Sequence, residues 1–306
     1  MEQKDKNYKY LQFPLCLIME TYKDIESGMN LIIDYGLIYY ATKQKFDLRD
    51  VAKQTCYDYY RNQNDLPGSI INTINTYDEF IPDEDYNGFS GAEFNPEDNI
   101  EQILSLFEEN SEFKDHCVLR YRIHTAAAFF NVKIHDYEST IRRYKKALSI
   151  KESFEAKFGP DVFPSCKPGM LFQVRDGNHK DIDFFRAYIG IKSMLGHRNF
   201  ISSNKPAILS RMVGCKSKAA FEYYTEGRFK EKAITQTIER YSKRYHMDNL
   251  LLSLAERKYT MFLSKEKVSV IYLSTYMDPE NLAKIIKEAK DRQNIKQRIR
   301  NVTASL

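Results

Sequence analysis

The chain has 306 residues, with 46 lysines and arginines, 42 aspartates and glutamates, and a formal net charge of +4. Hydrophobic residues make up 42% of it, which is enough for a packed core and argues against a wholly disordered chain. The longest stretch without Asp, Glu, Lys or Arg is the twelve residues Leu66–Tyr77, whereas a membrane-spanning helix needs about 20 mostly apolar residues. We therefore expect no membrane span.

The small net charge conceals a strong asymmetry along the chain. Residues 1–115 hold 10 basic and 23 acidic side chains, whereas residues 116–306 hold 36 basic and 19 acidic ones. The first part is therefore acidic and the second basic. Such an asymmetry is typical of a protein that binds a polyanionic partner.

The N-terminus and the cysteines indicate a reducing compartment. The opening residues, MEQKDKNYKY, mix both signs of charge and lack the basic and then apolar layout of a signal peptide. The five cysteines are widely spaced, and no Cys-x-x-Cys pair occurs. We expect a cytoplasmic protein with free, buried thiols at Cys16, Cys56, Cys117, Cys166 and Cys215.

Residues 1–77 are expected to form an N-terminal helical unit. The apolar run Leu11–Met19 fits either a strand or the start of a helix, because Pro14 interrupts it. Residues 26–43 carry apolar side chains at helical spacing. Asp47 is suited to cap a second helix, and Pro67 to open a third.

The middle of the chain divides into a linker and a helical segment. Residues 78–99 are rich in Asp and Glu and lack Lys and Arg, which is typical of an exposed acidic linker. Residues 100–158 then show helical periodicity, and we expect a central helical segment there. The main domain boundary is expected in the Pro- and Gly-containing stretch 159–181.

Residues 181–306 show the most informative order of elements. Their helices and strands are predicted from capping residues, helical periodicity and β-branched runs. The predicted order is a helix to Leu195 ended by Gly196, an extended piece at 199–202, two short helices around Gly214, a long helix at 230–257, a β-hairpin at 259–274 and a final helix at 279–302.

The two short helices carry a specific pattern over Pro206–Thr225. Ser203 or Asn204 is suited to cap the first helix, Ser217 the second, and Gly214 the sharp turn between them. Small or apolar side chains recur at the positions that would face a core, namely Leu209, Ser210, Val213, Cys215, Ala220 and Tyr223. This pattern resembles the helix-turn-helix motif of DNA-binding proteins. It departs from that family at Ala220, where a branched aliphatic residue is usual.

The surrounding elements extend the resemblance to the winged helix-turn-helix class. A helix and an extended piece precede the motif, and the hairpin at 259–273 stands where a wing would be. The long helix at 230–257 is a departure, because a wing ordinarily follows its recognition helix more directly. The expected fold class is therefore mainly α and multi-helical, with a C-terminal winged helix-turn-helix-like domain and a short β-hairpin.

The resemblance implies double-stranded DNA as the partner and places the second helix, Ser217–Thr225, in the major groove. Residues 186–306 also hold 24 basic and 11 acidic side chains, which suits a polyanion. The side chains expected to face the groove are Lys216, Ser217, Lys218 and Glu222. Those expected to lie near phosphates are Arg211, Arg228 and Lys230. Lys265 and Lys267 are expected to reach DNA from the tip of the hairpin.

Two other segments suggest contacts of a different kind. The predicted helices Asp47–Arg61 and Pro67–Tyr77 resemble a second, degenerate module of the same type. Their acidic surroundings suit protein contact or homodimerisation better than DNA, and plain structural packing is the alternative. The final helix is amphipathic and basic, with Leu282 and Ile286 on its apolar side. Such a helix is suited to bind phosphates, to pack on a partner subunit or to lie on an anionic membrane, and packing of its apolar side on its own domain is the default expectation.

Catalytic and metal-binding patterns are missing from the sequence. No phosphate-binding glycine loop and no His-Glu-x-x-His motif occurs. His116 and His124 are two helical turns apart, too far for a compact zinc pair, and Cys117 lacks a second cysteine nearby. We therefore expect no metal or cofactor and no enzymatic activity.

The resulting hypothesis is a non-enzymatic DNA-binding protein, either a transcriptional regulator or a replication or mobilisation accessory protein of a mobile element. One alternative is a protein-interaction scaffold whose acidic front and basic rear bind each other or a partner. A DNA-processing enzyme of a mobile element is the second alternative.

Overall fold

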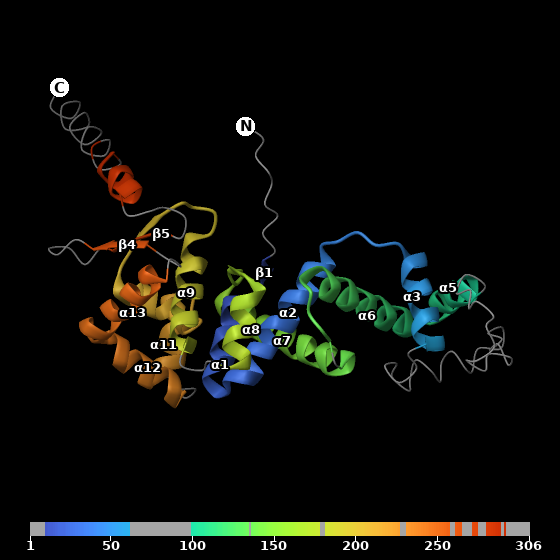
Figure 1. Ribbon diagram of the computed structural model, residues 1–306. Coiled ribbons are helices and arrows are strands. Elements are labelled where there is room, and N and C mark those ends of the chain that lie inside the picture. The colour runs from blue at the N-terminus through green and yellow to red at the C-terminus, as the bar shows by residue number, and fades with distance from the viewer. Residues whose placement is uncertain are drawn as a thin grey trace, which may run out of the picture. The chain divides into compact units, whose positions relative to one another are not determined.

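A computed structural model describes residues 10–61, 99–134, 136–177, 181–226, 231–257, 261–264, 271–274, 280–288 and 291. Over these residues the chain is mainly helical, as the sequence predicts, and it also forms two small antiparallel sheets (Figure 1). Among them, no helix combines the length and the hydropathy that a membrane span requires.

The chain divides into two compact units, and one of them is discontinuous in sequence. Unit 1 comprises residues 1–32 and 149–306, and unit 2 comprises residues 33–148. This division differs from the expected one, in which residues 1–77 form a unit of their own and the boundary lies at 159–181. Helices α2 (Ile25–Thr42) and α7 (Tyr137–Phe158) each contribute residues to both units.

Unit 1 includes the N-terminal segment because its apolar residues are buried against the later part of the chain. Strand β1 (Leu11–Gln12) pairs antiparallel with β2 (Ser165–Cys166), and Leu15 N donates to Val162 O at 2.9 Å. The segment continues as the 3-10 helix η1 (Leu15–Met19) and helix α1 (Glu20–Lys23). The expected connection 159–181 therefore contains a strand, and it also contains helix α8 (Pro168–Asp176).

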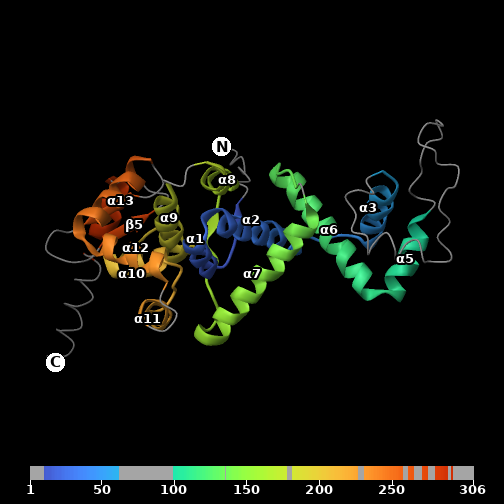
Figure 2. The ribbon, with the colours of Figure 1, turned by 90° about the horizontal axis from the view of Figure 1, so that it is seen from below.

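Unit 2 is built around helices α3 (Leu48–Arg61), α5 (Ile100–Glu109) and α6 (Ser111–Phe130) (Figure 2). The three helices bury a shared apolar cluster formed by Val51, Ala52, Cys56, Tyr59, Ile100, Ile103, Leu106, Phe107, Phe113 and Cys117. The N-cap of α6 is Asn110, whose side chain accepts from Phe113 N at 2.9 Å. The apolar side of α3 is thus used inside the unit.

Residues 182–226 of unit 1 have the predicted order of elements. Helix α9 (Ile182–Leu195) ends at Gly196 and is followed by β3 (Ile201–Ser203), α10 (Lys205–Met212) and α11 (Lys218–Glu226). The Asn204 side chain caps α10 by accepting from Ala207 N at 2.8 Å.

Two glycines fix the position of α10 and the turn that follows it. Helix α10 packs on α9, where a Cβ on Gly190 would lie only 2.8 Å from Met212 N. Gly214 has a φ of +87°, and a Cβ there would lie 2.9 Å from Met19 Cγ. Both close approaches require glycine. The turn is thereby held against α9 and the N-terminal segment.

The long helix predicted at 230–257 is wrong, because the chain breaks at Lys243. Helix α12 (Lys232–Ser242) ends there, Lys243 is extended (φ −70°, ψ 125°), and α13 (Arg244–Glu256) begins at the next residue. The break has a simple cause. One continuous helix would place the buried pair Ile234 and Tyr241 on the side opposite the buried pair Leu250 and Leu254, so both sets could not face one core.

The expected hairpin is present and belongs to a three-stranded sheet. Strands β4 (Met261–Ser264) and β5 (Ile271–Ser274) are antiparallel, and β5 also pairs with β3, giving the order β3-β5-β4. Strand β4 contacts α13, next to which it lies in Figure 1. Residues 280–288 are helical, and Leu282 and Ile286 are buried, as expected for the final helix.

Candidate nucleic-acid interface

The sequence predicted nine DNA-contacting residues, of which five are described. Arg228, Lys230, Lys265 and Lys267 lie outside the described residues. The other five are placed on α10, on α11 and in the turn between them, namely Arg211, Lys216, Ser217, Lys218 and Glu222.

The Lys216 side chain is engaged inside the fold. Its Nζ donates to the backbone carbonyl of Gly159 at 2.8 Å and to that of Pro160. These carbonyls follow the C-terminal end of α7, where a positive charge is stabilised by the helix dipole. A phosphate contact by Lys216 would require these hydrogen bonds to break.

The Arg211 guanidinium also points into the fold. Its Nη1 is buried and has no hydrogen-bond partner among the described residues. Burial lowers the pKa of Arg211, and the nearby Asp161 carboxylate opposes that shift. A group in this position is poorly placed to reach a DNA phosphate.

Helix α11 does not present a cationic surface. Ser217 Oγ caps the helix by accepting from Ala220 N at 3.2 Å, as predicted. Lys218 Nζ lies 3.2 Å from Glu222 Oε1, so its charge is paired on the same helix. Glu226 is exposed at the end of the helix, and the outward surface therefore carries two carboxylates and one ammonium group.

The rest of α11 packs on the C-terminal end of α7. The ring centroids of Phe158 and Tyr223 are 5.4 Å apart, and those of Phe158 and Tyr224 are 6.1 Å apart. Lys157 Nζ donates to Tyr223 OH at 3.1 Å. Helix α11 is thus a packing element of unit 1.

A cationic surface lies instead at the junction of α12 and α13. The residues 240–246, RYSKRYH, contain three permanent cations and no carboxylate. The side chains of Arg240 and Arg244 are 61% and 80% exposed, and Lys243 and Tyr245 are also exposed. We call Arg240, Lys243, Arg244 and Tyr245 the junction surface. Sequence reasoning missed it because it predicted one continuous helix over 230–257 and therefore no junction there.

The junction surface is held by contacts to α9 and α10. Tyr241 OH donates to Asp183 Oδ2 at 2.9 Å, and Arg240 Nη1 lies 3.7 Å from the same oxygen. Asp248 on α13 accepts from Lys205 Nζ at 2.5 Å and lies 3.5 Å from Arg244 Nε. The Asp248 carboxylate is therefore paired with two cations, and the Asp183 carboxylate is paired with Arg240.

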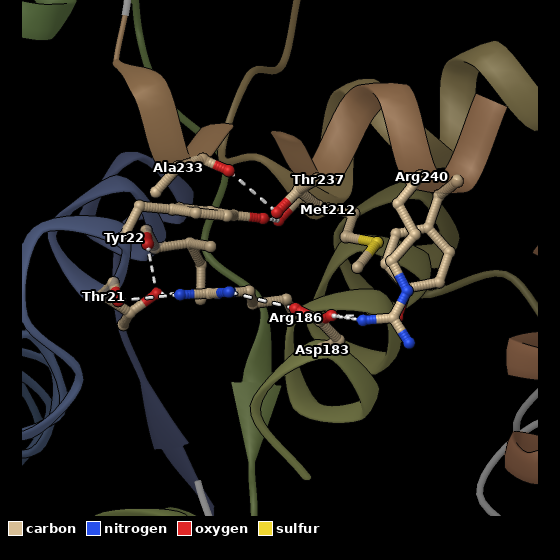
Figure 3. A network of polar contacts seen from close by, with 10 residues as sticks. Thr21, Tyr22, Asp183, Arg186, Met212, Ala233, Thr237 and Arg240 are labelled. Atoms are coloured by element: carbon tan, nitrogen blue, oxygen red, sulfur yellow. Dashed lines mark hydrogen bonds and ion pairs between the residues drawn. The ribbon is translucent and has the colours of Figure 1, made fainter. Parts of the chain in front are cut away.

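Behind this surface, Arg186 joins α9 to the N-terminal segment (Figure 3). Its guanidinium donates to Thr21 Oγ1 at 3.0 Å, to Thr21 O at 2.7 Å and to Asp183 Oδ1 at 3.0 Å. The Tyr22 ring lies over it, with 3.5 Å between Arg186 Cζ and the ring centroid. Tyr22 OH donates to Met212 O at 3.3 Å, so the same network reaches α10. Burial raises the pKa of Tyr22 and Tyr241 well above that of a free tyrosine, which keeps both hydroxyls protonated donors.

The described residues do not bring potential metal ligands together. No group of three or more His, Cys, Asp or Glu side chains among them could hold a metal ion. His116 Nε2 instead lies 2.9 Å from Glu138 Oε1. All five cysteines are buried free thiols, and burial raises the pKa of Cys56, Cys117, Cys166 and Cys215 to about 12.

No protein-family model, no curated protein and no solved structure matches this chain.

Proposed function

We propose that this chain is a non-enzymatic protein that binds double-stranded DNA through the junction of α12 and α13. The observation that carries the proposal is the break at Lys243. It divides one expected helix into two and exposes the cationic start of the second. In this proposal α13, and not α11, is the recognition helix.

The order of elements supports a winged helix-turn-helix arrangement. Strand β3 follows α9, the pair α12 and α13 precedes the hairpin, and β5 returns to pair with β3. The hairpin β4–β5 begins only a few residues after α13 ends, so α13 stands where a recognition helix stands before its wing. The departure noted in the sequence, a long helix between motif and wing, is thereby removed.

Electrostatics support the same surface. Lys243 has no ion-pair partner among the described residues, so its ammonium group is available to a phosphate. Arg240 and Arg244 flank it with side chains that are 61% and 80% exposed, and ion pairs of such exposed cations contribute little to stability. Cations of this kind gain affinity for DNA by releasing its counterions. A role as a transcriptional regulator or as a replication or mobilisation accessory protein of a mobile element fits such binding.

A salt titration of duplex binding tests the proposal. Fluorescence anisotropy with a labelled random duplex measures the binding constant K at each salt concentration. We expect log K to fall linearly as the logarithm of the salt concentration rises. Lys243→Ala is expected to reduce the magnitude of that slope by about 1, because one phosphate contact is lost. The matched control is Lys218→Ala on α11, whose 87% exposed side chain lies outside the junction surface and should leave the slope unchanged. No binding by the native protein at low salt would contradict the proposal.

A further inference from the structure

Helix α13 carries three neutral side chains on one of its faces. Tyr245, Asn249 and Leu252 are spaced four and three residues apart, so they lie on one face of the helix. The opposite face is buried and consists of Met247, Leu250, Leu251 and Leu254. Tyr245, Asn249 and Leu252 therefore face solvent, and we call these three residues the α13 strip.

The side chains of the α13 strip are exposed. Tyr245 is 70% exposed, with its ring centroid 5.6 Å from that of His246, and Leu252 is 48% exposed. Asn249 is exposed, and its amide has no hydrogen-bond partner among the described residues. The strip thus offers one free bidentate amide between two apolar contacts.

This chemistry matches one kind of base pair in the major groove. An adenine presents N7 as an acceptor and its N6 amino group as a donor, and an asparagine amide binds both at once. The paired thymine presents a C5-methyl group, which favours apolar contact. Resting on the proposed function, we infer that α13 reads A·T base pairs, with Asn249 on adenine and with Tyr245 and Leu252 against thymine methyl groups.

The surroundings of the strip fit this placement. Lys243 and Arg244 stand beside its N-terminal end, where a recognition helix enters the groove between two phosphate backbones. Asp248 lies beside Asn249 and would repel phosphate if it were free. Its carboxylate is paired with Lys205, so that repulsion is reduced even when Arg244 contacts a phosphate.

Selection from a random duplex library tests the inference. The native protein is expected to enrich sites with a fixed A·T pair, and changing that pair to G·C should weaken binding about tenfold. Asn249→Ala should remove the preference at that pair and retain the salt dependence, because the phosphate contacts remain. Gln236→Ala is the matched control, since Gln236 is an exposed amide residue on α12 away from the strip. It should enrich the same sites as the native protein.

Modified bases identify the atoms involved. Replacing the selected adenine by 7-deazaadenine removes the N7 acceptor. This change should weaken duplex binding by the native protein about tenfold and duplex binding by the Asn249→Ala variant less than twofold. Replacing neighbouring thymines by uracil removes the methyl groups. That change should weaken duplex binding by the native protein and have a smaller effect on duplex binding by the Leu252→Ala variant.

Three results would overturn the inference. The first is that the native protein binds duplex DNA with a strong salt dependence but selects no A·T pair. The second is that the Asn249→Ala variant retains the preference for the A·T pair. In either case α13 does not read bases as inferred, and the proposed function stands. If the native protein binds no duplex at low salt, both the inference and the proposed function are wrong.

Discussion

Replacing Arg186 by alanine is expected to lower the free energy of unfolding by about 3–5 kcal/mol, the range for removing one partner of a buried ion pair. Arg186 is 5% exposed and makes three hydrogen bonds, two to Thr21 and one to Asp183. Its loss leaves the Thr21 carbonyl without this charged donor and removes the cation beneath the Tyr22 ring. Equilibrium unfolding in urea, followed by circular dichroism, measures the change.

Arg240 provides the matched control for this prediction. It contacts the same Asp183 carboxylate, but at 3.7 Å and with a 61% exposed side chain. Arg240→Ala should therefore change the free energy of unfolding by less than about 1 kcal/mol. An Arg186→Ala variant as stable as Arg240→Ala would show that the buried network does not hold the N-terminal segment to α9.

The double variant Lys243→Glu with Arg244→Glu is expected to bind duplex DNA about 100-fold or more weakly than the native protein. It removes two cations from the junction surface and places two carboxylates against phosphate, and like charges at an interface cost several kcal/mol. Both positions are exposed, so the fold should be retained. Asp248 also keeps its contact with Lys205 when Arg244 is lost.

The control for the double variant lies on α11. Lys218→Glu introduces the same charge at a side chain that is 87% exposed and outside the junction surface. We expect it to change duplex affinity less than about threefold. Equal losses for the two variants would mean that binding follows net charge alone and is not located at the α12–α13 junction.

Local signals in the sequence predicted most of the described helices. Asn204 caps α10, Ser217 caps α11, and Gly196 and Gly214 adopt the positive φ values that end or turn the chain. These features depend on a few adjacent residues, so capping rules and glycine geometry are sufficient to find them. The hairpin was found in the same way, from two β-branched runs.

Contacts between residues far apart in the sequence could not be predicted from those local patterns. Strand β1 at residues 11–12 pairs with residues 165–166, and Arg186 contacts Thr21 across 165 positions of sequence. No local pattern in a single sequence specifies such a pairing. The N-terminal segment was therefore assigned to a separate unit, whereas it lies in the same unit as α9 and α10.

The candidate site moved for an identifiable reason. Lys216 and Arg211 look available in the sequence, but tertiary packing directs Lys216 to backbone carbonyls and buries Nη1 of Arg211. The junction at Lys243 did have a signal. The apolar stripe that includes Ile234 and Tyr241 changes sides before Leu250, and a continuous helix cannot follow that change.

Site-specific photocrosslinking tests most directly where DNA binds. The photoreactive residue p-benzoylphenylalanine replaces Tyr245 on α13 in one protein and Lys218 on α11 in another, both of them exposed positions. After irradiation with a bound duplex, we expect a covalent protein–DNA product from position 245 and little from position 218. A product from position 218 alone, or from neither position while the duplex is bound, would contradict the assignment of α13 as the recognition helix.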